Sequence, residues 1–403
     1  MAGPLDGVRV LDTTSMISGP LGTMVLADQG ADVIKVENPS QGDHTRAIAN
    51  RRAGLSASFL NNNRNKRSVA LNLKHPDGLA ACKRLAADCD VFVQNFRPGV
   101  AERIGLGEDA VRELRPDVIY VSISGFGEAG PYAQKPVYDP LVQSLSGLTT
   151  VQAGSDDARP RLVRTILPDK LTGMTAAQAI TAALFHKLKT GEGQHIRLSM
   201  LGSVVAFLWG SDMGSQTFVG DELPQQKAAS FIDLIYEVAD GCVSIAVQSD
   251  KEWSALAKAL DKPEWLEDPR FQTPAQRHEN IDARLEMTQE AVRGYGQQDL
   301  LELLEAHGVP CAPVLTRNEM IRHPQVEANR IVLQTEHEHA GTLRQAAPAA
   351  AFSRTPAEVR AGGPRLGEHT RAALQAAGYA DAEIDRLAGD GAIGLADAAG
   401  AAG

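Results

Sequence analysis

The chain has 403 residues, a mass of 43.0 kDa and an ordinary globular composition, with 43% hydrophobic and 22% charged residues. This length exceeds one typical hydrophobic core, so we expect two domains, or one large α/β unit with a smaller one. The 50 acidic residues outnumber the 40 basic ones. This balance argues against nucleic acid or an anionic membrane as the main partner, because both require clustered cations.

The cysteines and the N-terminal segment predict a cytoplasmic protein. Four cysteines, Cys82, Cys89, Cys242 and Cys311, are too few and too scattered for a disulfide framework, so we expect reduced, mostly buried thiols. The N-terminus has no basic segment followed by an apolar one, which is the pattern of a secretory signal. The longest charge-free apolar stretch, residues 198–211, is too short to span a bilayer.

Strand and helix patterns alternate in the first 125 residues. The expected elements are strand 8–12, helix 19–30, strand 31–37, helix 76–87, strand 90–96, helix 110–114 and strand 117–124. Strands that follow helices at this spacing are typical of parallel sheets. The sequence therefore predicts an α/β fold, in which a doubly wound and largely parallel sheet forms a large domain.

The remaining chain divides into three predicted parts. Residues 1–224 form the first part of the large domain, which includes an alanine-rich helix over 171–188 and a hairpin signal at 190–194. Residues 225–329 form a smaller α+β domain that begins with two strands joined at Asp240-Gly241. Residues 330–403 contain another strand pair, a strap and a helix at 368–377 that returns to the large domain. The tail after Gly389 is expected to fray.

One glycine motif superficially resembles a dinucleotide-binding site. The residues from Gly125 to Gly130 read GxGxxG and follow a predicted strand. However, Pro131-Tyr132 continues a turn where a helix is required, and the expected acidic residue is absent from 145–151. We interpret this segment as a loop over a site. The chain also lacks the P-loop, HExxH and GxSxG patterns, which disfavours the chemistry those motifs perform.

Two polar clusters have competing interpretations. The segment His337-Glu338-His339 is predicted to be an exposed hairpin rather than a metal site, because no third ligand is near in sequence. A basic cluster comprises Arg64, Lys66, Arg67 and Lys74. It is either a solvated face or a site for the phosphates of a nucleotide-bearing ligand, and the residues alone leave both open.

Asp169 lies at the predicted start of the alanine-rich helix, directly after Pro168. From the residues alone, a helix N-cap is the favoured interpretation, because aspartate accepts backbone N–H groups there and stabilises the helix dipole. A nucleophilic role is the alternative. Composition and spacing do not choose between these two roles.

Twelve segments in the same order resemble the family III CoA-transferases, the group that includes formyl-CoA transferase and carnitine CoA-transferase. They are LDGVRVLD (5–12), a Gly-Pro followed by LADQGADVIKVE (26–37), GD (42–43), NRNKRSVALNLK (63–74), DVFVQNFRPG (90–99), ISGFGEAGPY (123–132), YDPLVQSLSG (138–147), PDKLTGM (168–174), TGEGQHIRLSM (190–200), KPEWLEDPRF (262–271), GVPCAPV (308–314) and LGEHTR (366–371). This resemblance implies an interlocked homodimer that transfers CoA from an acyl-CoA donor to a carboxylic acid acceptor. CoA thioesters are then substrates, with no tightly bound cofactor, no metal, and no nucleic acid or membrane partner.

The resemblance also implies roles for particular residues. Asp169 matches the family's catalytic aspartate, which forms an acyl anhydride and then an aspartyl-CoA thioester. Positive potential at the helix N-terminus is expected to keep Asp169 ionised. The family's CoA-contacting positions fall on Met16, Leu71, Asn72, Leu73, Lys74, Asn95, Phe96, Arg97, Arg103, Lys135, Tyr138 and Asp139.

Two departures from the family bear on the substrate and the reaction. Formyl-CoA transferases carry a glutamine where this chain has Ile17, and a glycine run that has no counterpart between Ser211 and Ser230. Another short dicarboxylate fits no worse than oxalate. The α-methylacyl-CoA racemases share the fold but have a histidine where this chain has Tyr138, within Val137-Tyr138-Asp139, so racemase chemistry is the less favoured alternative. A non-catalytic acyl-CoA-binding protein is the third interpretation.

Overall fold

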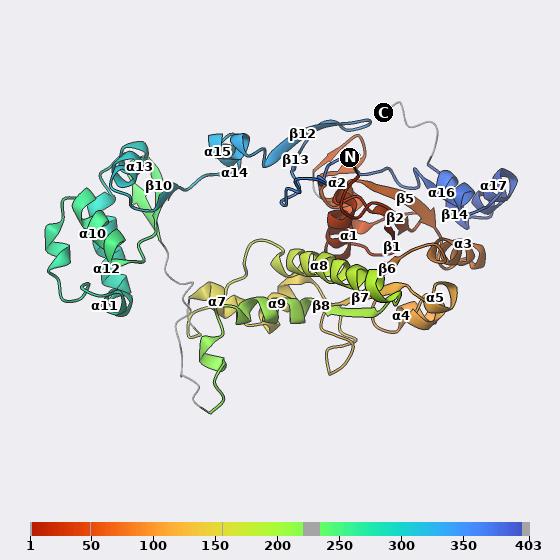
Figure 1. Ribbon diagram of the computed structural model, residues 1–403, viewed down its shortest axis with the longest axis horizontal. Helices are drawn as coiled ribbons and strands as arrows, with labels where there is room; N and C mark the ends of the chain where they lie inside the picture. Colours follow the sequence, from red (N-terminus) through yellow and green to blue (C-terminus); the bar gives the residue numbers. More distant parts are fainter. Residues whose placement is uncertain (1, 49, 155, 221–233, 397–403) are drawn as a thin grey trace. The chain divides into compact units, whose positions relative to one another are not determined.

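The computed structural model describes residues 2–48, 50–154, 156–220 and 234–396. The chain divides into two compact units (Figure 1). One unit comprises residues 1–226 together with 330–403, and the other comprises residues 227–329. None of the helices in the described ranges is both long enough and apolar enough to cross a membrane.

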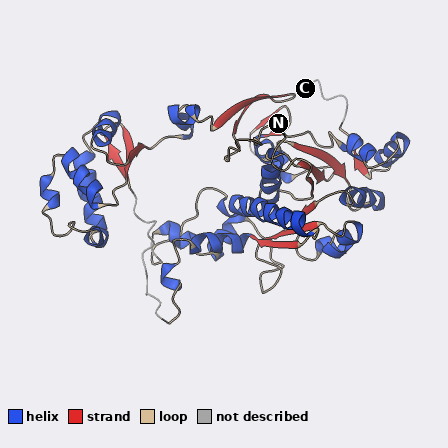
Figure 2. Ribbon diagram, in the orientation of Figure 1, coloured by secondary structure: helices blue, strands red, loops and turns tan. Residues whose placement is uncertain are grey.

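A seven-stranded sheet forms the centre of the first unit (Figure 2). Its strands are, in spatial order, β14 (Ile393–Gly394), β5 (Lys66–Leu71), β2 (Asp32–Glu37), β1 (Arg9–Asp12), β6 (Val91–Gln94), β7 (Ile119–Ser124) and β8 (His195–Ser199). All neighbouring pairs are parallel except β14 with β5. The chain builds the sheet outward from β1 to β5 and then restarts at β6 on the other side of β1. This reversal is a topological switch point, where α/β proteins bind ligands beyond the carboxyl ends of the strands.

Helices cover both faces of the sheet. They are α1 (Ser18–Asp28), α2 (Ala57–Asn63), α3 (Pro76–Ala86), α4 (Val100–Arg103), α5 (Glu108–Leu114), α6 (Asp139–Leu145), α7 (Leu148–Ala153), α8 (Leu167–Thr190), α9 (Met200–Trp209), α16 (Thr370–Ala376) and α17 (Asp381–Gly389). Alternate residues of the strands point to opposite faces. Val91 and Val93 therefore pack with α1 and α8, whereas Phe92 packs with α3 and α5. The predicted doubly wound α/β fold is confirmed.

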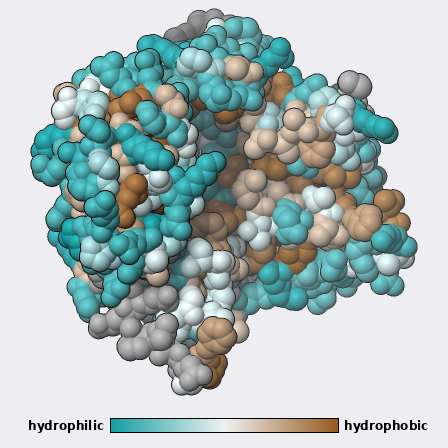
Figure 3. All heavy atoms as spheres, turned by 60° about the vertical axis from the view of Figure 1, so that its left-hand side comes forward, coloured by the Kyte–Doolittle hydropathy of each residue, from teal (hydrophilic) through white to brown (hydrophobic). Residues whose placement is uncertain are grey.

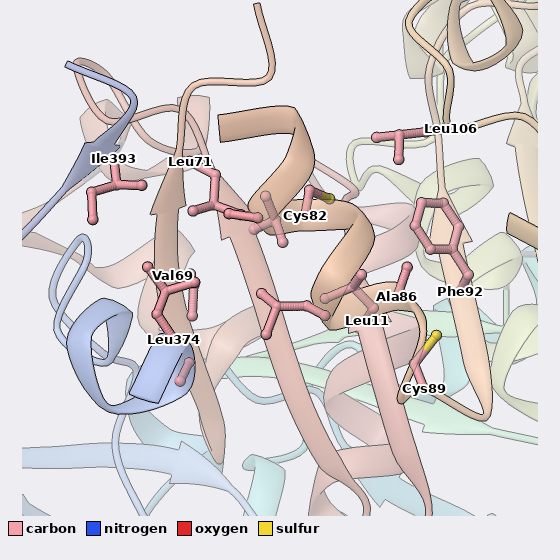
Figure 4. Close-up of a cluster of buried hydrophobic side chains, with 14 of the residues drawn as sticks. Leu11, Val69, Leu71, Cys82, Ala86, Cys89, Phe92, Leu106, Leu374 and Ile393 are labelled. Carbon is pink, nitrogen blue, oxygen red and sulfur yellow. The ribbon is translucent and has the colours of Figure 1, made fainter. Parts of the chain in front are cut away.

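Figure 4 shows the core on the second of these faces, where the helix that carries Cys82 and Ala86 lies against the strands that carry Leu11 and Leu71. All four cysteines are free, and Cys82 and Cys89 are buried. Burial raises the pKa of both of these thiols to about 12. They are therefore apolar core residues rather than reactive groups.

Two sequence predictions at the sheet are wrong. The hairpin signal at 190–194 instead ends helix α8, where Gly191 has φ 78°, and the chain then enters β8 parallel to β7. A glycine in this conformation serves a helix C-terminus as readily as a hairpin, so the local pattern did not distinguish them. The tail beyond Gly389 does not fray throughout, because Ile393 is buried and pairs with Leu71 in the sheet.

The second unit is a three-stranded antiparallel sheet with helices. Its elements are β9 (Ile235–Val238), β10 (Gly241–Ile245), α10 (Asp250–Ala259), α11 (Pro274–Glu279), α12 (Ile281–Val292), α13 (Gln297–Ala306), β11 (Cys311–Pro313), α14 (Arg317–Met320) and α15 (Pro324–Ala328). The expected strand pair turns at Asp240-Gly241 as β9 and β10. The core of this unit contains Trp253 and Trp265, whose rings stack 5.5 Å apart.

The strand pair after residue 330 belongs to the first unit. It is an antiparallel hairpin of β12 (Val332–His337) and β13 (Gly341–Ala346), and a smaller hairpin joins β3 (Arg51–Arg52) to β4 (Leu55–Ser56). His337 was expected to be exposed, but it is buried. Its Nε2 lies 2.9 Å from the carbonyl oxygen of Gly363, and its Nδ1 accepts the backbone N–H groups of His339 and Ala340. His337 therefore closes the turn and attaches the hairpin to the following strap.

Candidate active site

A cavity of about 320 Å³ lies at the carboxyl ends of β1, β6 and β7, at the switch point of the sheet. Loops that follow these three strands form much of its wall, and the starts of α6, α8 and α9 complete it. The lining residues are Ser15, Met16, Ser18, Asn95, Phe96, Arg97, Pro98, Ile123, Ser124, Gly125, Phe126, Ala133, Lys135, Pro136, Val137, Tyr138, Asp139, Asp169 and Met200.

Asp169 is the third residue of α8 and lies partly buried in this cavity. The N-cap of α8 is Ile166, which makes no side-chain capping bond, so the N-cap interpretation of Asp169 is wrong. The hydroxyl of Ser18 donates a hydrogen bond to Asp169 Oδ1. Asp169 is therefore a partly buried carboxylate in the first turn of a 24-residue helix, and its side chain is held from α1.

A second carboxylate, that of Asp139, lies next to Asp169. The backbone N–H of Asp169 donates to Asp139 Oδ2 at 3.4 Å, while Gln143 Nε2 donates to Asp139 Oδ1 at 2.6 Å. Asp139 is itself buried at the start of α6. The capping carboxylate at the start of α8 thus comes from another helix, and a second negative charge faces the catalytic candidate.

The electrostatic surroundings raise the pKa of Asp169. Burial is the main cause, and the negative charge of Asp139 acts in the same direction, whereas hydrogen bonds from Ser18 lower the pKa. Burial also raises the pKa of Asp139. The net shift of Asp169 is opposite to the one expected from the helix terminus alone.

The loop between β1 and α1 forms the wall that faces Asp169. Met16 in this loop has φ 71°, a left-handed conformation that a side chain disfavours. Asn95 makes two hydrogen bonds with Ser15, the residue before Met16. Ser15 N–H donates to Asn95 Oδ1 at 3.0 Å, and Asn95 Nδ2 donates to the Ser15 carbonyl at 2.8 Å. Met16 N–H donates to Asp43 Oδ1 at 3.2 Å. The loop is therefore fixed by two side chains from outside it.

Fully buried charged side chains of the sheet contact this loop and its neighbours. Lys66 Nζ lies 3.0 Å from Asp12 Oδ2, and Lys35 Nζ lies 2.9 Å from Asp43 Oδ2 and 2.8 Å from the Thr14 carbonyl. Burial would raise the pKa of Asp12, but the charges of the two lysines and two hydroxyl hydrogen bonds lower it. These charges therefore satisfy one another inside the protein, as buried charges must.

The predicted basic cluster is mostly structural. Arg64 pairs with buried Asp28 at 2.7 Å, Lys66 with Asp12, and Arg67 with Asp32 at 2.5 Å. Lys74 is exposed and has no ion pair among the described residues. Of the four cations, only Lys74 remains available to a phosphate.

The structure brings most of the predicted site residues together. Those that line the cavity with Asp169 are Met16, Asn95, Phe96, Arg97, Lys135, Tyr138 and Asp139. Leu71 lies in the sheet core, Asn72, Leu73 and Lys74 follow it at the carboxyl end of β5, and Arg103 is exposed in α4. These five residues do not line the cavity. Since β2 and β1 separate β5 from β6, a ligand that reaches residues 72–74 has to extend along this edge of the sheet.

Sequence reasoning missed Ser18 and the two-sided role of Asp139. A serine directly before Gly19-Pro20 has the pattern of a helix N-cap, and nothing in that pattern indicates a carboxylate partner 151 residues away.

The GxGxxG segment does form a loop at the site. A Cβ atom on Gly125 would lie 2.5 Å from the side chain of Val137, so only glycine allows Val137 to pack there.

One group of described residues has the geometry to hold a metal ion. It consists of Glu338, His339 and Glu368, whose ligand atoms lie within 4.8 Å of one another. Glu338 is exposed, and the group belongs to the hairpin and strap rather than to the cavity. Exposed acidic groups in such an arrangement are common without an ion.

The fold and the cavity define an α/β protein with a partly buried carboxylate at the switch point of its sheet. The model of CoA-transferase family III matches residues 5–370, so the chain belongs to that family and is a CoA-transferase. It is 33% identical to a human protein named succinyl-CoA:glutarate CoA-transferase, over 97% of this chain and 90% of that protein. It is 32% identical to formyl-CoA:oxalate CoA-transferase of Escherichia coli, over 98% of this chain and 100% of that protein. A CAIB/BAIF family protein from Brucella suis has a similar structure, with a TM-score of 0.82, 29% identity, and coverage of 94% of this chain and 100% of that one.

Proposed function

We propose that this chain moves CoA from an acyl-CoA donor to a carboxylic acid through covalent intermediates on Asp169. The observation that carries the proposal is the Asp169 carboxylate, which lines a cavity at the switch point and accepts a hydrogen bond from Ser18. A carboxylate is a suitable nucleophile here because it needs no activating base once it is ionised. Ser18 keeps one oxygen fixed relative to α1 while the other one reacts.

The reaction consists of balanced acyl exchanges. Asp169 attacks the donor thioester carbon, the C–S bond breaks, and CoA leaves as a thiolate, which gives an acyl-aspartyl anhydride. The thiolate attacks the aspartyl carbonyl, and the donor acid departs. The acceptor carboxylate then attacks the aspartyl-CoA thioester, and the released thiolate takes the acceptor acyl group from the resulting anhydride. Asp169 is regenerated, with no net gain or loss of water or protons.

CoA is a substrate in this proposal, and the cavity supplies contacts of suitable chemistry. Phe96 offers an apolar surface, and Arg97 offers a cation. Lys135 lies with its Nζ 3.5 Å from the ring centroid of Tyr132, which holds a second cation at the rim. Lys74 and Arg103 are exposed cations outside the cavity and are suited to phosphates further along the CoA molecule.

We propose succinyl-CoA and glutarate as the first substrates to test. The relative named succinyl-CoA:glutarate CoA-transferase is 33% identical over nearly the whole chain. A relative named for formyl-CoA and oxalate has similar identity. The absence of the glutamine at Ile17 and of the glycine run argues against that second pair.

Transfer is tested by mixing the protein with succinyl-CoA and a panel of acids and measuring new thioesters by mass spectrometry. We expect glutaryl-CoA with glutarate and little oxalyl-CoA with oxalate. No new thioester with any acid would contradict the proposed transfer. Oxalyl-CoA as the main product would retain the reaction but refute the substrate assignment.

The role of Asp169 is tested with Asp169→Ala. We expect exchange to fall at least about 1,000-fold while CoA binding changes little, because the variant loses the nucleophile and little contact area. Asp282→Ala is the matched control, because Asp282 also lies in the first turn of a helix but is exposed in the other unit. Exchange close to the parent rate in Asp169→Ala would overturn the proposal.

The racemase alternative predicts a different product. Val137 and Tyr138 occupy the segment where racemases carry an imidazole, so a second proton-transfer group is missing. We expect no deuterium at the α-carbon of a 2-methylacyl-CoA in deuterated water without an acceptor acid. Rapid incorporation under these conditions would favour the racemase and contradict the transferase.

A further inference from the structure

A second group of reactive side chains lies outside the cavity of Asp169. Ser122 of β7, His195 of β8 and Glu108 of α5 are in line, with Ser122 Oγ 2.8 Å from His195 Nε2 and His195 Nδ1 2.5 Å from Glu108 Oε2. All three line another cavity of the same unit, with a volume of about 600 Å³, which is within the range of small-molecule sites. The transfer reaction at Asp169 uses none of them.

The sheet fixes the positions of the serine and the histidine. His195 pairs directly with Tyr120 in the parallel ladder between β7 and β8, and its ring packs edge-on against the Tyr120 ring at 5.0 Å. Ser122 is two residues beyond Tyr120 and therefore points to the same face. The imidazole is thus oriented by backbone register and ring packing as well as by its hydrogen bonds.

Glu108 determines which imidazole nitrogen carries the proton. Burial would raise the pKa of Glu108, but hydrogen bonds from Arg112 and His195 lower it, so its carboxylate is ionised. An ionised carboxylate accepts a hydrogen bond from Nδ1–H, and in this tautomer the Nε2 lone pair of His195 faces the Ser122 hydroxyl. Serine, histidine and carboxylate have these same roles in serine hydrolases of unrelated folds.

A fourth side chain provides a donor beside the serine oxygen. Gln94 Nε2 lies 3.0 Å from Ser122 Oγ. The Gln94 amide cannot turn freely, because its Oε1 accepts the backbone N–H of Phe96 at 2.8 Å. A side-chain amide next to the nucleophile is one kind of donor that stabilises the oxyanion of an acyl-transfer intermediate.

We propose that Ser122, His195 and Glu108 form a second nucleophilic centre that hydrolyses small acyl esters and thioesters independently of Asp169. Ser122 Oγ attacks the acyl carbon as His195 Nε2 takes its proton, and the C–O or C–S bond then breaks. The leaving group receives that proton, which produces an acyl-serine. Water attacks the acyl-serine with His195 again as base, and the acid and the free hydroxyl are released. Gln94 donates to the oxyanion in both steps.

A fluorophosphonate, which reacts with activated serines, tests the nucleophile directly in the full-length protein. We expect fluoride release and one phosphonyl group, located on Ser122 by sequencing of the labelled peptide. This labelling depends on no variant, so misfolding cannot imitate a negative result. A protein that remains unlabelled, or a label confined to other residues, would overturn the proposal.

Hydrolysis of p-nitrophenyl acetate tests the centre as a whole. The assay uses Asp169→Ala as the parent, so that acyl transfer to Asp169 does not contribute and failure of the proposed transferase mechanism leaves the result interpretable. We expect Ser122→Ala and His195→Gln to lower the rate at least about 100-fold. Ser203→Ala is the control, because Ser203 is similarly buried but donates only to the Ser199 carbonyl at 3.0 Å. Equal rates in the parent, Ser122→Ala and Ser203→Ala would refute the proposal.

Discussion

Lys35 and Asp43 form a buried ion pair that holds a loop of the candidate site in place. Their ion pair is fully buried, and Asp43 also accepts Met16 N–H, so the pair connects β2 to the loop that faces Asp169. Removing one partner of a buried pair leaves the other charge without compensation, which is more destabilising than losing the pair itself.

We expect Lys35→Met to lower the free energy of unfolding by about 3–5 kcal/mol, because Asp43 then remains buried without its cation. Arg67→Met is the control on the neighbouring strand, since the pair of Arg67 with Asp32 is partly exposed, and we expect a loss of at most about 1 kcal/mol. Urea denaturation measures both. Equal losses would contradict the claim that burial determines the effect.

The pH dependence of transfer reports the surroundings of Asp169. In the proposed mechanism the carboxylate of Asp169 reacts when ionised. Because its pKa is raised, we expect transfer to fall at a higher pH than it would with an ordinary aspartate. Ser18→Ala removes hydrogen bonding that lowers this pKa and is expected to move the acid limb of kcat/KM to higher pH. Asp139→Asn removes a neighbouring negative charge and is expected to move it to lower pH. Shifts in the same direction would contradict this electrostatic description.

The family resemblance named candidate site residues, but it did not predict the contacts among them. Asp169, Asn95 and Phe96 were found through a family resemblance, and the structure brings them to one cavity. The local sequence pattern alone favoured an N-cap role for Asp169, because an N-cap aspartate and a nucleophilic aspartate look alike in sequence. The contact with Ser18 depends on the crossing of two helices that are far apart in the chain, and no local pattern contains that information.

At the scale of elements, the crossing of α1 and α8 determines the distance between Ser18 and Asp169. Two glycines meet there: a Cβ on Gly173 would lie 2.7 Å from the Ser18 carbonyl oxygen, and a Cβ on Gly22 would lie 2.9 Å from the Gly173 carbonyl oxygen. The helices therefore approach closely only because both positions lack a side chain.

We expect Gly173→Ala to lower the free energy of unfolding by about 1–3 kcal/mol and to lower kcat, because the added methyl group moves α8 away from Ser18. Gly389→Ala in α17 is the control, because no atom lies within 4 Å of its added Cβ, and helix propensity alone makes the change neutral or stabilising by up to about 1 kcal/mol. Thermal melting and transfer assays check both. Unaltered stability and kcat in Gly173→Ala would contradict the close-packing argument.

Hydrophobic patterns in the sequence identify an element when its two faces differ in polarity or when both faces are apolar. Strands β1, β2, β6 and β7 were found because buried parallel strands are continuous apolar runs. Strand β14 was missed because it has two residues, Ile393 and Gly394, in a segment rich in glycine and alanine. Its position depends on pairing with β5, more than 300 residues earlier, rather than on its own propensity.

At the scale of the whole molecule, exposed apolar side chains on α8 and α9 remain to be explained. They include Phe185, Leu188, Phe207 and Trp209, of which Leu188 is 83% exposed. Figure 3 shows apolar residues reaching the surface among hydrophilic ones. Exposed apolar side chains that gather into a patch mark association surfaces in many proteins, and we propose that these four residues contribute to the homodimer that the family resemblance implies.

We expect sedimentation velocity to give twice the mass of the chain, with no monomer at micromolar concentration. The double variant Phe185→Asp and Leu188→Asp is expected to reduce or abolish the dimer, because it introduces charge into an apolar contact. Asp substitutions at Lys258 and Lys262 of the other unit serve as the control. A monomeric parent protein would contradict the proposed dimer.

The most direct test of the central claim is covalent trapping at Asp169. The protein is incubated with succinyl-CoA, treated with hydroxylamine or borohydride, digested and examined by mass spectrometry. We expect a hydroxamate or a reduced side chain on the peptide that contains Asp169, and none in the absence of succinyl-CoA. Transfer to an acceptor acid with Asp169 unmodified throughout would contradict the proposed mechanism.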